Sequence, residues 1–220
     1  MKRRWVVAID GPGGAGKSTV ARLLADRLGY VYLDSGAMYR CIALLALRKG
    51  LEPEACVSLA ENANITFHPA GVGEPQRVLL EGEDVTRAIR TPEISQMASK
   101  VAAIPGVRTA MVELQRALGA QGGVVMEGRD IGTVVFPEAE LKIFLTASLE
   151  ERARRRHAEL EARGEVMDYN TVLVELRERD KRDETRAASP LVAATDAITV
   201  LTDGKTIEAL VTDLAGKITV

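Results

Sequence analysis

The sequence predicts an α/β fold in which helices cover both faces of a parallel sheet, because short apolar runs alternate with longer helical patterns. The apolar runs have the length and composition of buried parallel strands and lie at residues 5–9, 31–33, 124–126, 141–145 and 198–201. The helical patterns between and after them lie at residues 18–28, 37–48, 107–118, 150–163, 171–182 and 207–217. This alternation predicts three layers, with the sheet in the middle.

One segment interrupts the alternation. Between residues 64 and 89 the pattern is strand-like, with a glycine-containing turn at 69–73, and helical patterns flank it at 53–62 and 92–102. Two or three antiparallel strands are expected there. We therefore predict one domain for the 220-residue chain, with a small lobe inserted at about residues 37–105.

The composition is ordinary for a globular protein, with 46% hydrophobic and 27% charged residues. A net charge of −2 argues against nucleic acid or a membrane surface as the main partner. Residues 1–4 are basic, but the apolar segment behind them ends at Asp10, too early for a signal peptide or a membrane span. Cys41 and Cys56 lack metal-type spacing, so we expect reduced thiols in a cytosolic protein.

The segment between the first strand and the first helix has the Gly-x4-Gly-Lys-Ser spacing of a phosphate-binding loop. Its residues are Gly11, Pro12, Gly13, Gly14, Ala15, Gly16, Lys17, Ser18 and Thr19. Glycines let the backbone point several N–H groups at phosphates, and the helix adds its positive dipole end. Lys17 suits the β- and γ-phosphates, and the Ser18 hydroxyl suits Mg²⁺. The segment therefore predicts a nucleoside triphosphate site.

The same glycines also fit a dinucleotide-binding fingerprint. Gly11, Gly13 and Gly16 have the Gly-x-Gly-x-x-Gly spacing, and Asp34 ends the next apolar run. A dinucleotide pyrophosphate needs no lysine in this loop, whereas a terminal triphosphate does. Lys17 therefore favours a triphosphate and a three-layer P-loop NTPase fold.

Arginines recur where ligands are expected. Arg40 lies one turn beyond Ser35, the candidate N-cap of the second helix, and Arg129 follows the third strand together with Asp130. Ligands bind beyond the carboxyl ends of parallel strands, and arginine binds phosphate bidentately. Isolated, Arg40 is more typical of a solvated helix face. The Arg129–Asp130 pair, bracketed by glycines, is poorly explained by packing.

Two helical segments carry further arginines. Arg179, Asp183 and Arg186 share one face if their helix continues that far, although an ordinary salt-bridged helix end is equally compatible. Arg152 and Arg156 lie one turn apart, where a solvated face is somewhat favoured. In a phosphoryl-transfer enzyme, however, mobile arginines neutralise charge and exclude water.

No general base is obvious, which suits transfer to an acceptor that is already an anion. A GTPase is disfavoured because an Asn-Lys-x-Asp motif is missing from the sequence. A sugar or alcohol kinase requires a carboxylate base, and Asp34 and Asp130 keep that alternative open. A nucleotide-dependent switch that binds a partner protein is a third alternative, against which the many arginines argue.

Several blocks resemble the bacterial cytidylate kinase family. They are the phosphate-binding loop at 11–19, Leu-Asp-Ser-Gly-Ala-Met-Tyr-Arg at 33–40, Leu-Glu-Gly-Glu-Asp-Val-Thr at 80–86, Glu-Gly-Arg-Asp-Ile-Gly-Thr-Val-Val-Phe-Pro at 127–137, Lys-Ile-Phe-Leu-Thr-Ala-Ser at 142–148 and Glu-Arg-Asp-x-Arg-Asp at 178–183. The resemblance covers nearly the whole chain. It implies ATP-dependent phosphorylation of CMP or dCMP with Mg²⁺, in a cytosolic and monomeric enzyme that has a core, a monophosphate-binding lobe and a lid at about 150–168.

The resemblance also implies roles for individual residues. Ser35 and Arg40 match positions near the sugar and phosphate of the monophosphate, and Ser99, Arg108 and Asp130 match positions that recognise the cytosine edge. Arg129, Arg179 and Arg186, together with Lys17, match the catalytic phosphate-binding positions, Asp183 matches a contact to the sugar, and the arginines of the lid helix match contacts to the donor phosphates. Glu127 replaces an aspartate found in many relatives, and either side chain suits Mg²⁺ held through water.

Overall fold

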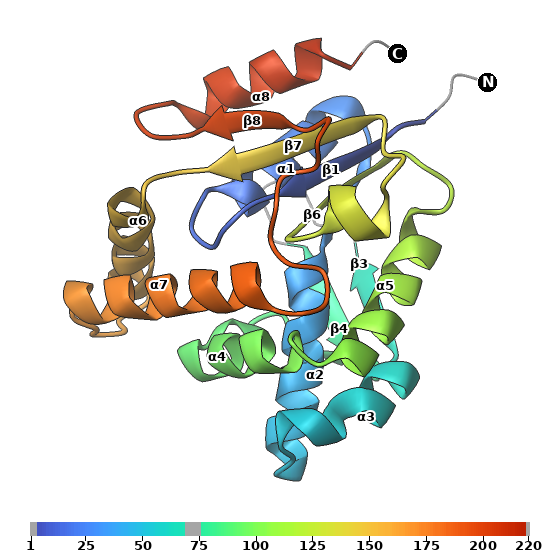
Figure 1. Ribbon diagram of the computed structural model, residues 1–220, viewed down its shortest axis with the longest axis vertical. Helices are drawn as coiled ribbons and strands as arrows, with labels where there is room; N and C mark the ends of the chain where they lie inside the picture. The colour runs from blue at the N-terminus through green and yellow to red at the C-terminus, as the bar shows by residue number, and fades with distance from the viewer. Residues whose placement is uncertain (1–3, 69–75, 219–220) are drawn as a thin grey trace.

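The computed structural model describes residues 4–68 and 76–218. Its larger sheet has five parallel strands in the order β2 (Val31–Asp34), β6 (Val124–Gly128), β1 (Val6–Asp10), β7 (Leu141–Thr146) and β8 (Ile198–Leu201). The parallel sheet predicted from the apolar runs is confirmed (Figure 1). The first three strands in this order are β2, β6 and β1, and each of them leads into a segment with predicted site residues.

Helices cover both faces of this sheet. On one face α1 (Lys17–Leu28) and α8 (Ile207–Gly216) pack against each other and against alternate residues of β1, including Val7 and Ile9. On the other face, α5 (Pro105–Gly119) and a π-turn, η3 (Ile131–Val135), pack against residues that point the opposite way. Because helices cover both faces and side chains alternate across a sheet, the central strands β6, β1 and β7 are largely buried on both sides, whereas the edge strand β8 is mostly exposed.

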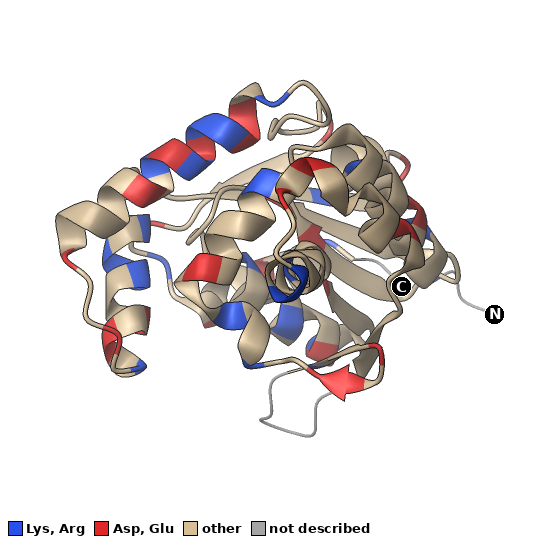
Figure 2. Cartoon of the chain, turned by 90° about the horizontal axis from the view of Figure 1, so that it is seen from below, with Lys and Arg blue, Asp and Glu red and all other residues tan. Residues whose placement is uncertain are grey.

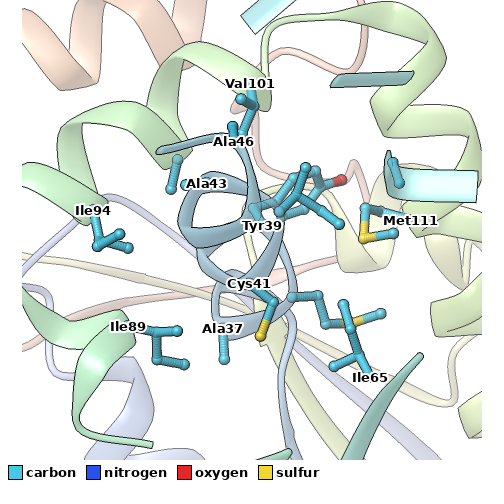
Figure 3. Packing of buried hydrophobic residues seen from close by; sticks show 14 of the residues in the cluster. Ala37, Tyr39, Cys41, Ala43, Ala46, Ile65, Ile89, Ile94, Val101 and Met111 are labelled. Carbon is cyan, nitrogen blue, oxygen red and sulfur yellow. The ribbon is translucent and has the colours of Figure 1, made fainter. Parts of the chain in front are cut away.

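The segment predicted as an inserted lobe is built around one long helix. Figure 3 shows this helix, α2, in the middle of a hydrophobic cluster that includes Ile65, Ile89, Ile94 and Met111. Fully buried alanines on α2 let these neighbours approach closely. The elements of the segment are α2 (Ser35–Lys49), η1 (Pro53–Cys56), α3 (Val57–Asn62), β3 (Ile65–His68), β4 (Arg77–Leu80), β5 (Glu83–Asp84), η2 (Ala88–Arg90) and α4 (Pro92–Val101).

The structure contains the strands and the helix that the sequence predicts for this segment. The strands β3, β4 and β5 form the expected antiparallel sheet, whereas the turn predicted at 69–73 lies outside the described residues. The helix predicted at 53–62 is a 3₁₀ turn followed by the short helix α3, a common way for a helix to begin. Cys41 and Cys56 are free and buried, as expected.

The helices α6 (Leu149–Ala162) and α7 (Tyr169–Thr185) follow β7 and lie beside the end of the sheet (Figure 1). They share a small apolar cluster that includes Leu160 and Leu176. This cluster is separate from the main cores, so the two helices form a distinct layer over the strand ends. Within the described residues, no helix is both long and apolar enough to cross a membrane.

Candidate functional site

The phosphate-binding loop connects β1 to α1 at the carboxyl edge of the sheet. Gly16 has a φ of +89° at the N-cap of α1, a conformation that side chains rarely adopt. A Cβ on Gly11 would overlap the carbonyl oxygen of Leu145 on β7, so the loop can approach the sheet only as glycine. No side chain caps α1, which leaves the backbone N–H groups of its first turn available to an anion.

Lys17 lies in the first turn of α1 and is 6% exposed. Its Nζ donates a hydrogen bond to the carbonyl oxygen of Pro12 at 2.7 Å rather than to a carboxylate. Burial and the positive charge of Arg129 lower the pKa of Lys17 to about 7, although the negative charges of Glu127 and Asp10 oppose this shift. Because these carboxylates compensate the buried ammonium group only in part, a bound phosphate would favour its charged form.

Glu127 provides a buried carboxylate at the end of β6, next to the loop. It accepts a hydrogen bond from the Tyr32 hydroxyl at 2.6 Å, and the Ser18 hydroxyl is a further partner. Burial raises the pKa of Glu127, and the negative charge of Asp34 raises it further. Among the described residues there is no cluster of three His, Cys, Asp or Glu side chains suited to a metal ion.

The loop opens into a cavity of about 680 Å³. Ten arginines and two lysines line this cavity against six carboxylates, so its lining is strongly basic although the whole chain is slightly acidic. In Figure 2 basic and acidic residues alternate along the helix at the upper left, α7. The cavity lining includes these predicted site residues: Gly13, Gly14, Ala15, Gly16, Lys17, Ser18, Thr19, Ser35, Arg40, Ser99, Arg108, Arg129, Asp130, Arg179, Asp183 and Arg186.

Two predicted residues, Gly11 and Pro12, do not line the cavity. Instead they support the loop. Gly11 packs on β7, and the carbonyl oxygen of Pro12 accepts the hydrogen bond from Lys17. Their part in the loop is therefore conformational.

Asp183 on α7 lies at the centre of three arginines. Arg129 Nε donates a hydrogen bond to Asp183 Oδ2 at 2.9 Å, and Arg179 Nε lies 4.0 Å from the same oxygen. Arg186 Nη1 lies 3.8 Å from Asp183 Oδ1 even though α7 ends at Thr185. Arg179 and Asp183 share one side of α7 as predicted, whereas Arg186 lies beyond the end of the helix and approaches Asp183 from the extended chain that follows.

This arginine cluster has spare hydrogen-bonding capacity. Arg179 Nε and Arg186 Nη2 are buried and have no hydrogen-bond partner among the described residues. Burial, together with repulsion from Arg129, lowers the pKa of Arg179 to about 10. Three guanidinium groups thus surround Asp183, and the further carboxylate near them, Asp130, lies 3.9 Å from Arg186. The cluster is suited to binding an anion such as a phosphate.

A second buried pair joins α5 to the turn after β6. Arg108 and Asp130 form an ion pair with side chains only 4% and 5% exposed. Arg108 also donates to the carbonyl oxygen of Ala102 at 3.1 Å, and its guanidinium lies 5.5 Å from the centre of the Tyr39 ring. Ser99 on α4 accepts a hydrogen bond from Arg182 Nε at 3.3 Å. Three distant sequence segments therefore contribute to one wall of the cavity.

The N-cap of α2 corrects one sequence prediction. Asp34 caps the helix by accepting from the Ala37 N–H at 3.0 Å, one position before the predicted cap Ser35. Ser35 instead donates to the carbonyl oxygen of Glu127 at 2.6 Å, because the sheet places β2 beside β6. Arg40 Nη1 lies 3.4 Å from Asp34 Oδ2. Although burial opposes it, the charges of Arg40 and Arg90 hold the pKa of Asp34 below its usual value.

The arginines of α6 divide into two groups. Arg154, Arg155 and Arg156 line the cavity, whereas Arg152 does not. Arg152 is 6% exposed, so the solvated face favoured by its sequence pattern is wrong for this residue. It donates to Asp180 Oδ2 on α7 at 2.6 Å and to the carbonyl oxygen of Gly13 at 3.3 Å. Arg152 thus holds α6, α7 and the loop together.

The sequence Ser148-Leu149-Glu150-Glu151 at the start of α6 has the pattern of a capping box, but only half of the box forms. Ser148 accepts from the Glu151 N–H at 3.3 Å, as a capping box requires. The backbone N–H of Ser148, however, donates to Asp203 after β8 rather than to Glu151. Glu151 pairs with Arg154 and Arg155. Tertiary contact with the loop after β8 replaces the second half of the capping box.

Several residues of the cavity escaped the sequence analysis. Arg90 and Arg163 line it from η2 and from the end of α6, and Arg163 Nη1 donates to the carbonyl oxygen of Arg90 at 3.3 Å. Thr202 and Lys205 line it from the loop after β8. Three of these residues are basic and Thr202 is a hydroxyl residue, and such residues are too common in a sequence to identify a site.

Comparison with known proteins agrees with this geometry. The profile of the family described as cytidylate kinase matches residues 7–219. The chain belongs to the cytidylate kinase family. A cytidylate kinase of Pelotomaculum thermopropionicum is 57% identical over 194 residues, covering 87% of this chain and 85% of the relative. One of Carboxydothermus hydrogenoformans is 53% identical over 211 residues, covering 94% of each chain.

Some relatives in the cytidylate kinase family are longer. A bifunctional pantoate ligase/cytidylate kinase of Synechococcus elongatus is 53% identical over 214 residues, and the match spans 94% of this chain but 41% of that protein. Among solved structures, a shikimate kinase from Bacteroides thetaiotaomicron superposes with a TM-score of 0.50 at 12% identity, covering 97% of each chain. That likeness supports the P-loop kinase fold alone.

The contacts of Arg152 with Asp180 and Gly13, here called the clamp, predict how its replacement changes the stability of the fold. Replacing Arg152 by methionine leaves Asp180 buried without its cation, so the free energy of unfolding should fall by about 3–5 kcal/mol. Chemical denaturation of the ligand-free protein measures this. The matched control is Arg154→Met on the same helix, where the ion pair is exposed and little change is expected. Equal effects of the two substitutions would contradict a clamp at Arg152.

Proposed function

We propose that the protein transfers the γ-phosphoryl group of ATP to CMP and dCMP, giving CDP and dCDP. Membership in the cytidylate kinase family supports this reaction. The observation that carries it is the single cavity that runs from the phosphate-binding loop to the Asp183 arginine cluster and the Arg108–Asp130 pair. Such a cavity accommodates two anionic ligands in contact, one at each end.

The chemistry needs charge neutralisation more than proton transfer. A monophosphate oxygen is already an anion at neutral pH, so no general base has to activate it. Lys17, Arg129, Arg179 and Arg186 are the catalytic residues of the proposal, because they bring buried positive charge to the phosphates. In a water-poor cavity such charges stabilise the transferring group strongly and are already in place before reaction.

The donor end suits a nucleotide with Mg²⁺. The loop at residues 11–19 holds the ATP phosphates through the backbone N–H groups of residues 13–19 and through Lys17, while Gly11 and Pro12 shape the loop. The Ser18 hydroxyl is the expected metal ligand. The buried Glu127 carboxylate beside Ser18 fits a second role, orienting water around the metal. Bound there, Mg²⁺ supplies charge neutralisation and orientation of the phosphates.

The acceptor end supplies contacts to each part of CMP. Ser35, Arg40 and Arg129 bind the phosphate region, Arg179 and Asp183 bind the phosphate and sugar, and Ser99 and Arg108 join Asp130 at the base. Asp130 Oδ2 is engaged by Arg108, while Oδ1 lies 3.9 Å from Arg186. Asp130 therefore retains capacity to accept from the cytosine 4-amino group, which uracil lacks, and a carboxylate repels the uracil O4.

The proposal also covers the domain organisation, the oligomeric state, the location and the partners of the protein. The 220 residues act as a single domain in which about residues 37–105 form the monophosphate-binding lobe and about residues 150–168 form a lid. Arg154, Arg155 and Arg156 line the cavity from the lid helix and so are the arginines placed to contact donor phosphates. We further propose a monomeric, cytoplasmic enzyme that acts on small molecules and not on nucleic acid.

ADP release from Mg-ATP, with CMP, dCMP, UMP, AMP and shikimate offered separately, tests the proposed reaction. CMP and dCMP should stimulate release strongly and UMP far less. Preference for another acceptor would retain a P-loop kinase but overturn the assignment of Asp130. Slow ATP hydrolysis that no acceptor stimulates would instead favour a nucleotide-dependent switch.

Replacing Lys17 by alanine should lower kcat for CMP phosphorylation by about 100- to 1,000-fold, the usual effect of losing one transition-state donor. The fold should remain intact, because the removed ammonium group is buried without a carboxylate partner. Circular dichroism and steady-state kinetics measure the two effects. Lys49→Ala, at an exposed position on α2, is the control. Near-native turnover in the Lys17 variant would refute the triphosphate assignment.

Replacing Asp130 by alanine should selectively damage the use of CMP. The ratio of kcat/KM for CMP to that for UMP should fall by about 10- to 100-fold, the value of a hydrogen bond to a charged group. Asp213→Ala, at an exposed position on α8, should leave this ratio unchanged. A parallel loss of CMP and UMP turnover in the Asp130 variant would show that the residue does not recognise the base.

A further inference from the structure

Asp10 is a buried acidic residue to which the proposed mechanism assigns no role. It is the last residue of β1, directly before the phosphate-binding loop, and is 5% exposed. Burial raises the pKa of Asp10 to about 6, although hydrogen bonds from the backbone N–H groups of Gly132 and Ile131 oppose the rise. Holding a carboxylate there is costly, which points to a specific task for it.

The two carboxylate oxygens of Asp10 each accept one backbone hydrogen bond. Oδ1 accepts from the Ile131 N–H at 2.8 Å, and Oδ2 accepts from the Gly132 N–H at 2.7 Å. These are the first two N–H groups of the π-turn η3, which begins directly after Asp130. Asp10 at the end of β1 therefore caps the turn that follows β6. The two N–H groups that it binds are 121 and 122 residues away in sequence.

This cap determines what Asp130 is able to do. An aspartate at the N-cap of a helical turn normally accepts from the N–H groups of that turn with its own side chain. Asp130 occupies the N-cap of η3 with φ −148° and ψ 25°, yet its side chain makes no capping bond. Asp10 already occupies the Gly132 N–H, one of the two groups that such a cap would bind. The Asp130 carboxylate instead pairs with Arg108 and lines the cavity.

We propose that Asp10 is a positioning residue that sets acceptor specificity through Asp130. It ties the first residue of the η3 turn to the strand that leads into the phosphate-binding loop. It thereby fixes the base-recognising carboxylate relative to the site of the donor phosphates. This inference rests on the proposed function, because its readout is the preference for CMP.

The experiment compares Asp10→Asn with the wild-type chain in steady-state kinetics with CMP, UMP and Mg-ATP. The variant keeps the shape of the side chain but opposes one backbone N–H with an amide donor. We expect the KM for CMP to rise and the CMP-to-UMP preference to fall, each by about ten-fold, while the KM for ATP stays within about two-fold. Asp26→Asn, exposed on α1, is the matched control and should change neither value.

A double-mutant cycle separates positioning from general damage. Because Asp10 acts through Asp130, the double variant Asp10→Asn/Asp130→Asn should lose little more CMP preference than Asp130→Asn alone. Additive losses would overturn the inference. Parallel increases in KM for ATP and CMP, with unchanged preference, would also overturn it and leave Asp10 as a support of the phosphate-binding loop.

If Asp10→Asn does not fold, a second variant, Gly132→Ala, tests the same inference. In Gly132→Ala the new Cβ would lie 3.4 Å from Asp10 Oδ2 and 3.2 Å from the Lys142 side chain, which Pro137 and Asp196 hold in place, so the turn must shift slightly. A smaller fall in CMP preference, with the KM for ATP unchanged, is expected, and an unchanged preference would count against the inference. A wild-type enzyme without preference for CMP would refute the proposed function instead.

Discussion

Positive charge held away from water, in excess of the nearby carboxylates, is the constraint on which the rest of the structure depends. Arg129, Arg179 and Arg186 share Asp183, and repulsion within this group contributes to the lowered pKa of Arg179. Such an arrangement destabilises the ligand-free fold unless other contacts hold it. The buried clamp between Arg152 and Asp180 is one such contact, and bound phosphate supplies the missing negative charge.

The order of the strands explains how distant segments reach this charge. Because β2, β6 and β1 are neighbours, the register places Asp34 beside Glu127 and Asp10 beside Gly128. The phosphate-binding loop, the start of α2 and the turn with Arg129 and Asp130 therefore leave the same edge of the sheet. Backbone hydrogen bonds across these ends, such as those accepted by Asp10, then fix the segments relative to one another.

Side chains that look alike in sequence perform different tasks in this framework. Arg152 and Arg155 lie less than one turn apart on α6, yet Arg152 is buried against α7 while Arg155 lines the cavity and donates to Thr202. Similarly, Asp34 and Asp130 both stand at N-caps, but Asp34 caps its own helix and Asp130 does not. In each pair, what packs beside the residue decides its role.

The sequence by itself determined the five strands, the main helices and the phosphate-binding loop, because hydrophobic periodicity and glycine spacing are local properties. The family resemblance supplied residues such as Ser99 and Arg108, which the fold then brought to one cavity. Only the tertiary structure decided that Asp34 rather than Ser35 caps α2, that Arg152 is a buried clamp and that Asp10 caps the turn after Asp130. These roles depend on partners far away in the chain, and local sequence carries no information about which donor or charge will pack beside a side chain.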